Sequence, residues 1–251
     1  MRSLAGAHAI VTGGSRGIGL AIAKHFAAEG ASISLVGRDE ARLQTALQSL
    51  DLKPGLTLHS APKHATYAFD VGKTSGWQSL MSQIKSNKQN VDILINAAGI
   101  TQNSFLFNSA TTDMRAILNT NLEGTMHGCQ FVIQKMMKQK SGCIVNVSSL
   151  LATHAGRGAS VYAASKAGIL GLTRALAWEV GRFGIRINVI LPGYIETEMT
   201  ASIAKSDSLE SLIPLGRLGS VEEVADAAAF LVKNSYAHNT VLNLDGGLSA
   251  T

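Results

Sequence analysis

Short apolar runs alternate along this chain with longer segments of helical periodicity, and this alternation limits the fold more than any other feature. Strands are predicted at residues 8–12, 32–36, 66–69, 91–96, 143–147, 185–191 and 240–244. Helices are predicted near residues 17–28, 39–50, 73–87, 111–139, 160–182 and 221–232. Such a repeat favours a parallel sheet with right-handed crossovers. We therefore expect an α/β chain whose doubly wound, Rossmann-type sheet has about seven strands and helices on both faces.

The composition fits one globular domain that spans residues 1–251. The chain is 46% hydrophobic and 16% charged, which excludes a disordered chain. No apolar run of about 18 residues predicts a membrane span, and the N-terminus leaves no room for a signal peptide. Cys129 and Cys143 are too few for a disulfide framework, and no histidine or cysteine cluster predicts a metal site. We expect a protein of the cytoplasm or the mitochondrial matrix.

Two segments interrupt the alternation. Residues 51–64 form a polar connection, which we interpret as a surface insertion. Residues 192–217 form a long connection after the sixth predicted strand, and connections of this length are usually lids or binding loops. We expect a substrate lid over residues 192–217.

The first predicted strand runs directly into a glycine-rich stretch, Thr-Gly-Gly-Ser-Arg-Gly-Ile-Gly at residues 12–19, and then into a helix. Glycines allow a sharp turn and a close approach to a diphosphate, while the helix N-terminus offers free N–H groups. The alternative is a plain tight turn, which the position at the first strand-helix junction disfavours. The candidate diphosphate-binding residues are Gly13, Ser15, Arg16, Gly17, Ile18 and Gly19.

The end of the second predicted strand bears on the choice of nucleotide. An acidic residue there would bind a ribose 2′-hydroxyl, but Gly37 stands at that position and Arg38 follows it. Together with Arg16, Arg38 could clamp a 2′-phosphate, since the planar guanidinium matches phosphate oxygens. This favours NADP(H) over NAD(H), unless both arginines are simply solvated.

Residues 145–166 hold the constellation that points to catalysis. Tyr162 and Lys166 stand four residues apart on a predicted helix and project from one face. A tyrosine hydroxyl needs a nearby cation to exchange protons near pH 7, and Lys166 is placed to be that cation. Ser149 ends the preceding strand and could hold a substrate oxygen by a hydrogen bond. An isolated Tyr-x-x-x-Lys would mean little; the surrounding motifs give it weight.

Over essentially its whole length the chain resembles the short-chain dehydrogenase/reductase family. The resemblance implies a catalytic group of Asn121, Ser149, Tyr162 and Lys166, with Asn121 in a water-bridged proton relay to Lys166. It implies further cofactor contacts, from Tyr162 and Lys166 themselves and from Asp70, Val71, Asn96, Ala97, Gly99, Pro192, Gly193, Ile195 and Thr197. Hydride would pass between a nicotinamide and a carbonyl carbon while Tyr162 donates the proton, or the reverse.

Within that family, several stretches look most like the 3-oxoacyl-[acyl-carrier-protein] reductases of fatty acid biosynthesis. They include Asn188 to Gly193 and the Asp-Gly-Gly at residues 245–247. This resemblance implies a substrate with a 3-oxoacyl thioester, linked to an acyl carrier protein, and a homotetramer. Alcohol, sugar, steroid and quinone dehydrogenases of the family stay open as alternatives, as does a catalytically silent scaffold. Nucleic acid is disfavoured because the aromatic residues are scattered.

The charge distribution adds a hypothesis about the partner. The net charge is +5, and residues 106–190 carry 9 Lys and Arg against 3 Asp and Glu. An acidic carrier protein would be attracted to a basic rim beside the catalytic cleft. The residues expected to form that rim are Lys135, Lys138, Lys140, Arg174 and Arg182. The alternative is that the lysines merely complement a helix C-terminus.

One position departs from the family pattern. The chain has His238-Asn239-Thr240 where Thr-Gly is usual. Asn239 then takes the glycine position, and asparagine is among the residues that best tolerate a left-handed backbone. We expect the fold to survive this change.

Overall fold

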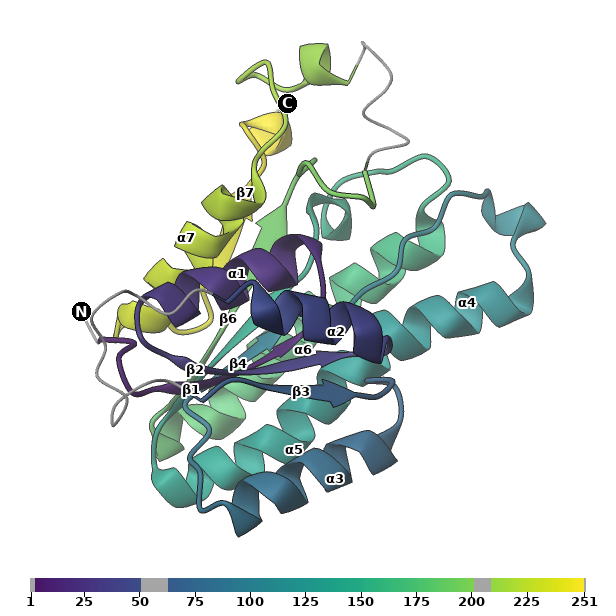
Figure 1. Ribbon diagram of the computed structural model, residues 1–251. Helices are drawn as coiled ribbons and strands as arrows, with labels where there is room; N and C mark the ends of the chain where they lie inside the picture. The colour runs from purple at the N-terminus through teal and green to yellow at the C-terminus, as the bar shows by residue number, and fades with distance from the viewer. Residues whose placement is uncertain (1–2, 51–62, 201–208, 251) are drawn as a thin grey trace.

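Seven parallel strands form one sheet in the order β3-β2-β1-β4-β5-β6-β7 (Figure 1). The computed structural model describes residues 3–50, 63–200 and 209–250. The strands are β1 (His8–Thr12), β2 (Ser32–Gly37), β3 (Ala65–Ala68), β4 (Ile93–Asn96), β5 (Gly142–Val147), β6 (Ile185–Pro192) and β7 (Val241–Leu244). The predicted doubly wound sheet is confirmed, and the predicted strand ends differ from the observed ones by two residues at most.

Helices cover both faces of the sheet (Figure 1). They are α1 (Gly17–Ala28), α2 (Glu40–Gln48), α3 (Thr74–Ser86), α4 (Thr111–Leu118), α5 (Gly124–Gln139), α6 (Ser160–Val180) and α7 (Val221–Lys233). Residues of α1, α2 and α7 pack into the apolar core on one face, and residues of α3, α5 and α6 pack into the core on the other. No helix in the described ranges is long and apolar enough to cross a membrane.

The order of the strands decides where a ligand can bind. The chain builds outward from β1 to β2 and β3, then returns to place β4 on the other side of β1. At such a reversal the loops after adjacent strands diverge and leave a crevice at their carboxyl ends. The loops that follow β1 and β4 therefore border the same crevice, and the loop after β5 lies beside them.

The helix expected over residues 111–139 is interrupted, which corrects the prediction of one continuous helix. Residues Asn119–Glu123 form a π-helical turn between α4 and α5. Asn121 lies in this turn, fully buried, with its side chain hydrogen-bonded to both backbone polar groups of Ile100. A π turn is rare and occurs frequently at functional sites.

Asn239 adopts a left-handed backbone with φ of 56°, which confirms the expectation for this position. Its N–H donates to the carbonyl of Ile187 on β6, so the turn before β7 closes without a glycine. The predicted insertion at residues 51–64 lies almost wholly outside the described residues. Of the predicted lid over residues 192–217, residues 201–208 lie outside them as well.

His8 is buried at the amino end of β1 and is held as the neutral imidazole. Its Nδ1 lies 2.6 Å from the carbonyl oxygen of Asn90, so Nδ1 carries the proton, and Nε2 then accepts from the Ser34 hydroxyl at 2.8 Å. Burial lowers the pKa of His8, against smaller opposing effects of the Asn90 carbonyl and Asp92. The unfolded chain therefore binds a proton at a pH where the folded chain does not.

We predict that His8 makes the fold sensitive to acid. Because its pKa is lower in the folded chain than in the unfolded chain, its contribution to stability is complete above about pH 6.5 and is lost as the pH falls. His8→Gln removes this titration, so the difference in unfolding free energy between wild type and variant should shift in favour of the variant from pH 7 to pH 5. Urea unfolding at both pH values measures it, and a pH-independent difference would contradict it.

Candidate active site

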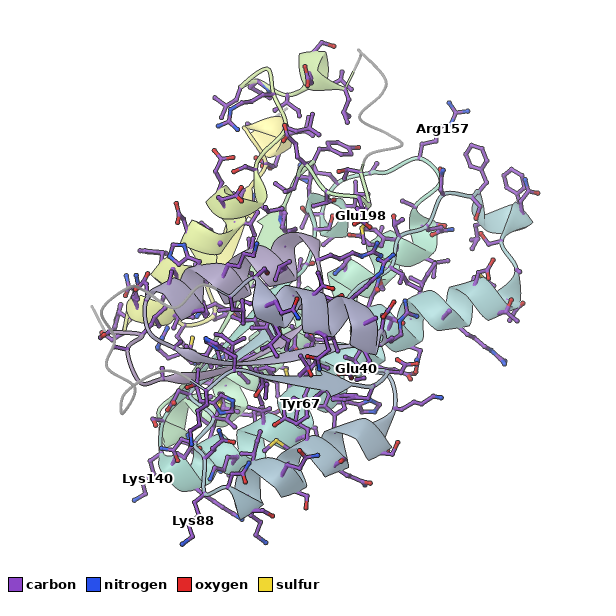
Figure 2. All side chains as sticks on the ribbon, viewed as in Figure 1. Glu40, Tyr67, Lys88, Lys140, Arg157 and Glu198 are labelled. Carbon is purple, nitrogen blue, oxygen red and sulfur yellow. The ribbon has the colours of Figure 1, made fainter. Side chains whose placement is uncertain are left out.

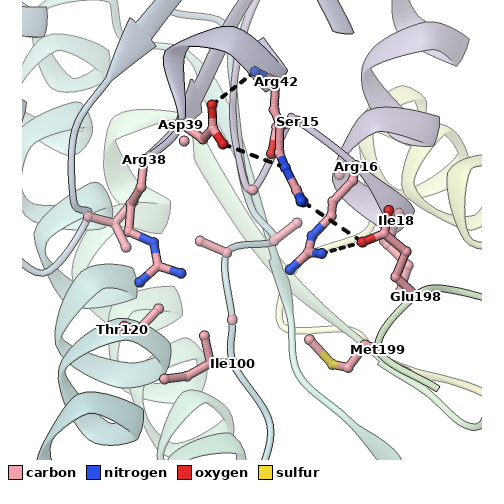
Figure 3. Close-up of a pocket in the computed structure, with 18 of the residues that line it drawn as sticks. Ser15, Arg16, Ile18, Arg38, Asp39, Arg42, Ile100, Thr120, Glu198 and Met199 are labelled. Atoms are coloured by element: carbon pink, nitrogen blue, oxygen red, sulfur yellow. Dashed lines mark hydrogen bonds and ion pairs between the residues drawn. The ribbon is translucent and has the colours of Figure 1, made fainter. Parts of the chain in front are cut away.

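A pocket of about 350 Å³ opens at the carboxyl ends of β1, β2, β3 and β4 (Figure 3). Most of the predicted cofactor-binding residues line it. They are Gly13, Ser15, Arg16, Gly17, Ile18, Gly19, Arg38, Asp70, Val71, Ala97, Gly99 and Thr197. Sequence reasoning missed Arg42, Ile100, Thr120 and Glu198, which also line it. Thr120 belongs to the π-helical turn, so this turn contributes to the pocket wall.

The glycine-rich loop packs too tightly for side chains at two of its positions. Gly13 has φ of 65°, and a Cβ placed there would lie 2.8 Å from the carbonyl oxygen of Ala97. A Cβ on Gly19 would meet the backbone of Gly13 itself. The loop can therefore approach both the strand beneath it and a ligand above it. α1 begins here with Arg16 as its N-cap, without a capping side-chain bond and without an acidic residue in its first turn. Its N-terminus is thus suited to an anion.

Ser149, Tyr162 and Lys166 come together where β5 ends and α6 begins. The hydroxyls of Ser149 and Tyr162 share a hydrogen bond. The Lys166 Nζ lies 5.7 Å from the centre of the Tyr162 ring and donates to the carbonyl oxygen of Val147 at 2.9 Å. The neighbouring Ser148 instead donates to the backbone oxygen of Lys166, so it attaches α6 to the sheet. Of the two serines, Ser149 is therefore the one that faces Tyr162.

Asn121 and Lys166 both approach the side of Gly99 on which a Cβ would stand. A Cβ placed on Gly99 would be 3.4 Å from the Asn121 Oδ1 and 3.5 Å from the Lys166 Nζ. The absence of a side chain on Gly99 therefore leaves space between the amide and the ammonium. The Asn121 Nδ2 also donates to the Ser165 hydroxyl at 3.1 Å, which ties the π-helical turn to α6.

A family model described as short chain dehydrogenase matches residues 7–208. The chain belongs to the short-chain dehydrogenase/reductase family. The 3-oxoacyl-[acyl-carrier-protein] reductase FabG of Chlamydia muridarum is 40% identical, with 96% of each chain covered. Carbonyl reductase family member 4 of Xenopus laevis is 38% identical over 95% of this chain and 96% of that protein. A gluconate 5-dehydrogenase structure from Burkholderia cenocepacia, in complex with NADP and tartrate, matches with a TM-score of 0.90 at 29% identity, over 98% and 96% of the two chains.

The arginines of this short-chain dehydrogenase meet acidic side chains at the pocket rim (Figure 3). Arg16 forms an ion pair with Glu198, and Arg42 lies 3.8 Å from the same carboxylate. Asp39 caps α2, accepts from the Arg42 N–H and lies 3.6 Å from the Arg42 Nε. Because Arg42 stands three residues after Asp39 on the first turn of a helix, this spacing was the signal that could have identified it.

Burial governs the protonation of the catalytic group. Burial raises the pKa of Tyr162 above its ordinary value, and the hydrogen bond from Ser149 only partly opposes this. Burial lowers the pKa of Lys166 to about 8. The tyrosine pKa is therefore raised, contrary to the expectation that the Lys166 cation lowers it. Lys166 nevertheless stays mostly protonated at pH 7 and can hold a positive charge near the phenol.

Some predicted cofactor contacts lie away from the pocket wall. The Asn96 side chain is buried and donates to Asn146 Oδ1 at 2.9 Å, so it joins β4 to β5. Pro192 pairs with Leu244 in the sheet, and the Gly193 N–H donates to the Leu244 carbonyl. Ile195 is buried in the core, whereas Thr197, Glu198 and Met199 line the pocket. Tyr162 and Lys166, also predicted as cofactor contacts, are not among the lining residues. Among the described residues no cluster of three or more histidine, cysteine or acidic side chains could hold a metal ion.

The expected basic rim does not lie beside this chain's own pocket, and that placement is corrected here. Lys135, Lys138 and Lys140 stand at the end of α5 that leads into the amino end of β5, whereas the pocket lies at the carboxyl ends. Figure 2 accordingly has Lys140 on the opposite side of the molecule from Glu198. Arg182 precedes the amino end of β6 in the same way. Counting charge by sequence segment could not distinguish the two ends of a strand.

We predict that the buried ammonium of Lys166 lowers the stability of the fold. A pKa of about 8 in place of 10.5 corresponds to a destabilisation of up to about 3 kcal/mol below pH 8. Lys166→Met should abolish turnover yet raise the unfolding free energy at pH 7. The net gain should be about 1 to 3 kcal/mol, because loss of the hydrogen bond to the Val147 carbonyl offsets part of it.

The stability gained by Lys166→Met should shrink as the pH rises from 8 toward 10.5, because Lys166 then loses its proton in the folded and, finally, in the unfolded wild type. Urea unfolding of wild type and variant at pH 7 and pH 10 measures it. A variant that is less stable at pH 7, or a gain that does not change with pH, would show that burial of the ammonium is not unfavourable here.

Proposed function

We propose that this chain is an NADPH-dependent carbonyl reductase that acts on the 3-keto group of 3-oxoacyl thioesters and gives the 3-hydroxyacyl product. The observation that carries the proposal is the group of Ser149, Tyr162 and Lys166, whose Lys166 Nζ comes within 3.5 Å of a Cβ built on the pocket-lining Gly99. Relatives named 3-oxoacyl-[acyl-carrier-protein] reductase, about 40% identical over nearly the whole chain, support the choice of substrate. The enzyme class follows from the family; the substrate and the cofactor are the proposed part.

The pocket fits a dinucleotide. Its wall includes the glycine-rich loop, and its helix N-terminus and arginines are donors suited to phosphate. NADPH, when bound, would supply the hydride to the carbonyl carbon. Residues 13–19 would hold the diphosphate, Asp70 and Val71 the adenine, and Gly99 and Thr197 would border the nicotinamide.

The chain's own residues would then handle the substrate oxygen and its proton. The Ser149 hydroxyl donates a hydrogen bond to the carbonyl oxygen and polarises the C=O bond. The Tyr162 hydroxyl donates its proton to that oxygen as negative charge develops on it. Lys166, positively charged near the phenol, stabilises the phenolate that remains. Asn121, whose Oδ1 shares with the Lys166 Nζ the space beside Gly99, could take part in returning a proton to Lys166.

A second candidate is an oxidoreductase of sugar acids. The similarity to a gluconate 5-dehydrogenase structure, 29% identical with a TM-score of 0.90, favours it. That structure is also in complex with NADP, which supports the cofactor proposal but not the thioester substrate. Both candidates use the same catalytic group, so only turnover of substrates separates them.

The proposed binding of an acidic carrier protein is linked to the proposed oligomeric state. Because Lys138 and Lys140 lie at the opposite edge from their own pocket, an acidic carrier protein bound there would serve a second subunit. We propose a homotetramer for this reason as well as from the family resemblance. The almost fully exposed Trp178 and Tyr236 offer apolar area for contacts between subunits.

We predict that Arg38 sets the preference for NADPH. Arg38→Ala should lower kcat/KM for NADPH by about tenfold to a hundredfold, the effect of losing one charged hydrogen bond, and leave NADH turnover nearly unchanged. Arg115→Ala, an arginine on α4 outside the pocket lining, is the matched control. Steady-state kinetics with both nucleotides measures it. A wild type that prefers NADH would refute the 2′-phosphate argument.

We predict that Tyr162→Phe removes turnover by at least about a hundredfold, because the ring remains but the proton donor is lost. NADPH binding, followed by fluorescence, should be retained.

The substrate panel is acetoacetyl thioester, free and carrier-bound, together with a keto-sugar acid, a quinone and a simple ketone. Thioester turnover above the others supports the proposal, and a keto-sugar acid as the best substrate would decide for the second candidate.

A further inference from the structure

The catalytic helix α6 begins without a capping side chain of its own. Its N-cap residue is Ala159, which has no side-chain oxygen to accept from the first free N–H groups. The Gln102 side chain, from the loop after β4, takes that role. Its Oε1 accepts from the Val161 N–H at 2.7 Å and from the Tyr162 N–H at 3.1 Å. These are the second and third helical residues, whose amides an N-cap side chain ordinarily satisfies.

Gln102 is itself held in one orientation. Its Nε2 donates to the Ser104 carbonyl oxygen at 2.9 Å and to the Ser109 hydroxyl at 3.2 Å. The Ser104 N–H donates in turn to the Gly158 carbonyl at 3.2 Å, just before α6. With the amide nitrogen committed to the loop, the amide oxygen is the atom left to face the helix.

The contact falls on the backbone of the catalytic tyrosine. The N–H of Tyr162 goes to Gln102, and its carbonyl oxygen accepts from the Ser165 hydroxyl at 2.6 Å. The Asn121 Nδ2 donates to that same Ser165 hydroxyl. The first turn of a helix is the part that frays most readily, and here it carries the reacting group.

We propose that Gln102 is a positioning residue of the reaction, which caps α6 from a distant loop and so holds the Tyr162 hydroxyl against Ser149 and near Lys166. It touches neither the pocket lining nor the phenol, so its effect passes through the helix. The positioning role rests on the proposed function; the cap does not.

Two variants separate the accepting oxygen from the bulk of the side chain. Gln102→Met keeps the length but accepts no hydrogen bond. Gln102→Glu keeps an accepting oxygen and adds a negative charge that a helix N-terminus favours, but it gives up the Nε2 donation to the Ser104 carbonyl. Gln83→Met is the matched control, because Gln83 is an exposed glutamine on α3 whose Nε2 lies 3.5 Å from a serine hydroxyl.

Hydrogen exchange measured by mass spectrometry tests the cap without any turnover. Exchange at the Val161 and Tyr162 amides should rise in Gln102→Met and stay near the wild-type rate in Gln102→Glu and Gln83→Met. Kinetics test the positioning: kcat should fall roughly tenfold in Gln102→Met, as for a slightly misplaced catalytic group, and largely recover in Gln102→Glu. The NADPH dissociation constant should stay unchanged throughout.

The pH at which the Tyr162 phenol ionises is a second measurement of positioning that does not need turnover. If Gln102→Met weakens the Ser149 contact, the phenol should ionise at a higher pH than in wild type, followed by ultraviolet absorbance against a Tyr162→Phe background.

Unchanged exchange in Gln102→Met would overturn the cap. Faster exchange with unchanged kcat and unchanged phenol ionisation would overturn the positioning role. Equal losses in Gln102→Met and Gln102→Glu would overturn the role of the accepting oxygen and assign the effect to the lost Nε2 donation to the Ser104 carbonyl. If the wild type reduces none of the panel, the proposed function fails separately, while exchange and phenol ionisation still decide this proposal.

Discussion

A chain of buried hydrogen bonds joins the three elements on which the catalytic geometry depends. Asn96 on β4 donates to Asn146 on β5, which stands directly opposite it in the sheet, and Asn146 donates to Thr173 on α6 at 2.9 Å. All three residues are nearly inaccessible to solvent. A shift of register would break the Nδ2 donations of both amides in an apolar core, where the Asn96 Oδ1 already has no partner among the described residues. The network thus fixes the ends of β4 and β5 and the helix above them relative to one another.

The loops inherit their positions from that network. The loop after β4 carries Gly99 to the pocket and Gln102 to the start of α6, so one segment contributes to the pocket wall and to the backbone contacts of Tyr162. The Thr12 hydroxyl accepts from the Ala97 and Ala98 N–H groups and so ties the same segment to β1. Asn121 completes the enclosure by bonding both polar groups of Ile100, which a regular α-helical turn need not have allowed. The π-helical turn is therefore part of how the site is assembled.

Sequence reasoning succeeded where hydrophobic period and local spacing carry the information. Strands buried on both faces read as continuous apolar runs, and the four-residue spacing of Tyr162 and Lys166 is a property of any α-helix. It failed where the outcome depends on tertiary contacts. Nothing in the residues Asn119–Glu123 distinguishes a π turn from an α turn until Ile100 is beside Asn121. Arg42 and Glu198 come from segments far apart in the chain, and only the closed fold brings them to one rim.

The burial that organises this site also opposes the protonation states that the chemistry needs. Taking Lys166 out of water makes its charge unfavourable, and the same dry surroundings make the Tyr162 phenolate unfavourable. Each group alone is therefore driven toward neutrality. When both are charged, the Lys166 ammonium and the Tyr162 phenolate each lower the free energy of burying the other, since opposite charges attract strongly where little water screens them. A site of this kind gains its reactivity from the pair, and so it depends on whatever holds the first turn of α6 in place against Ser149 and Gly99.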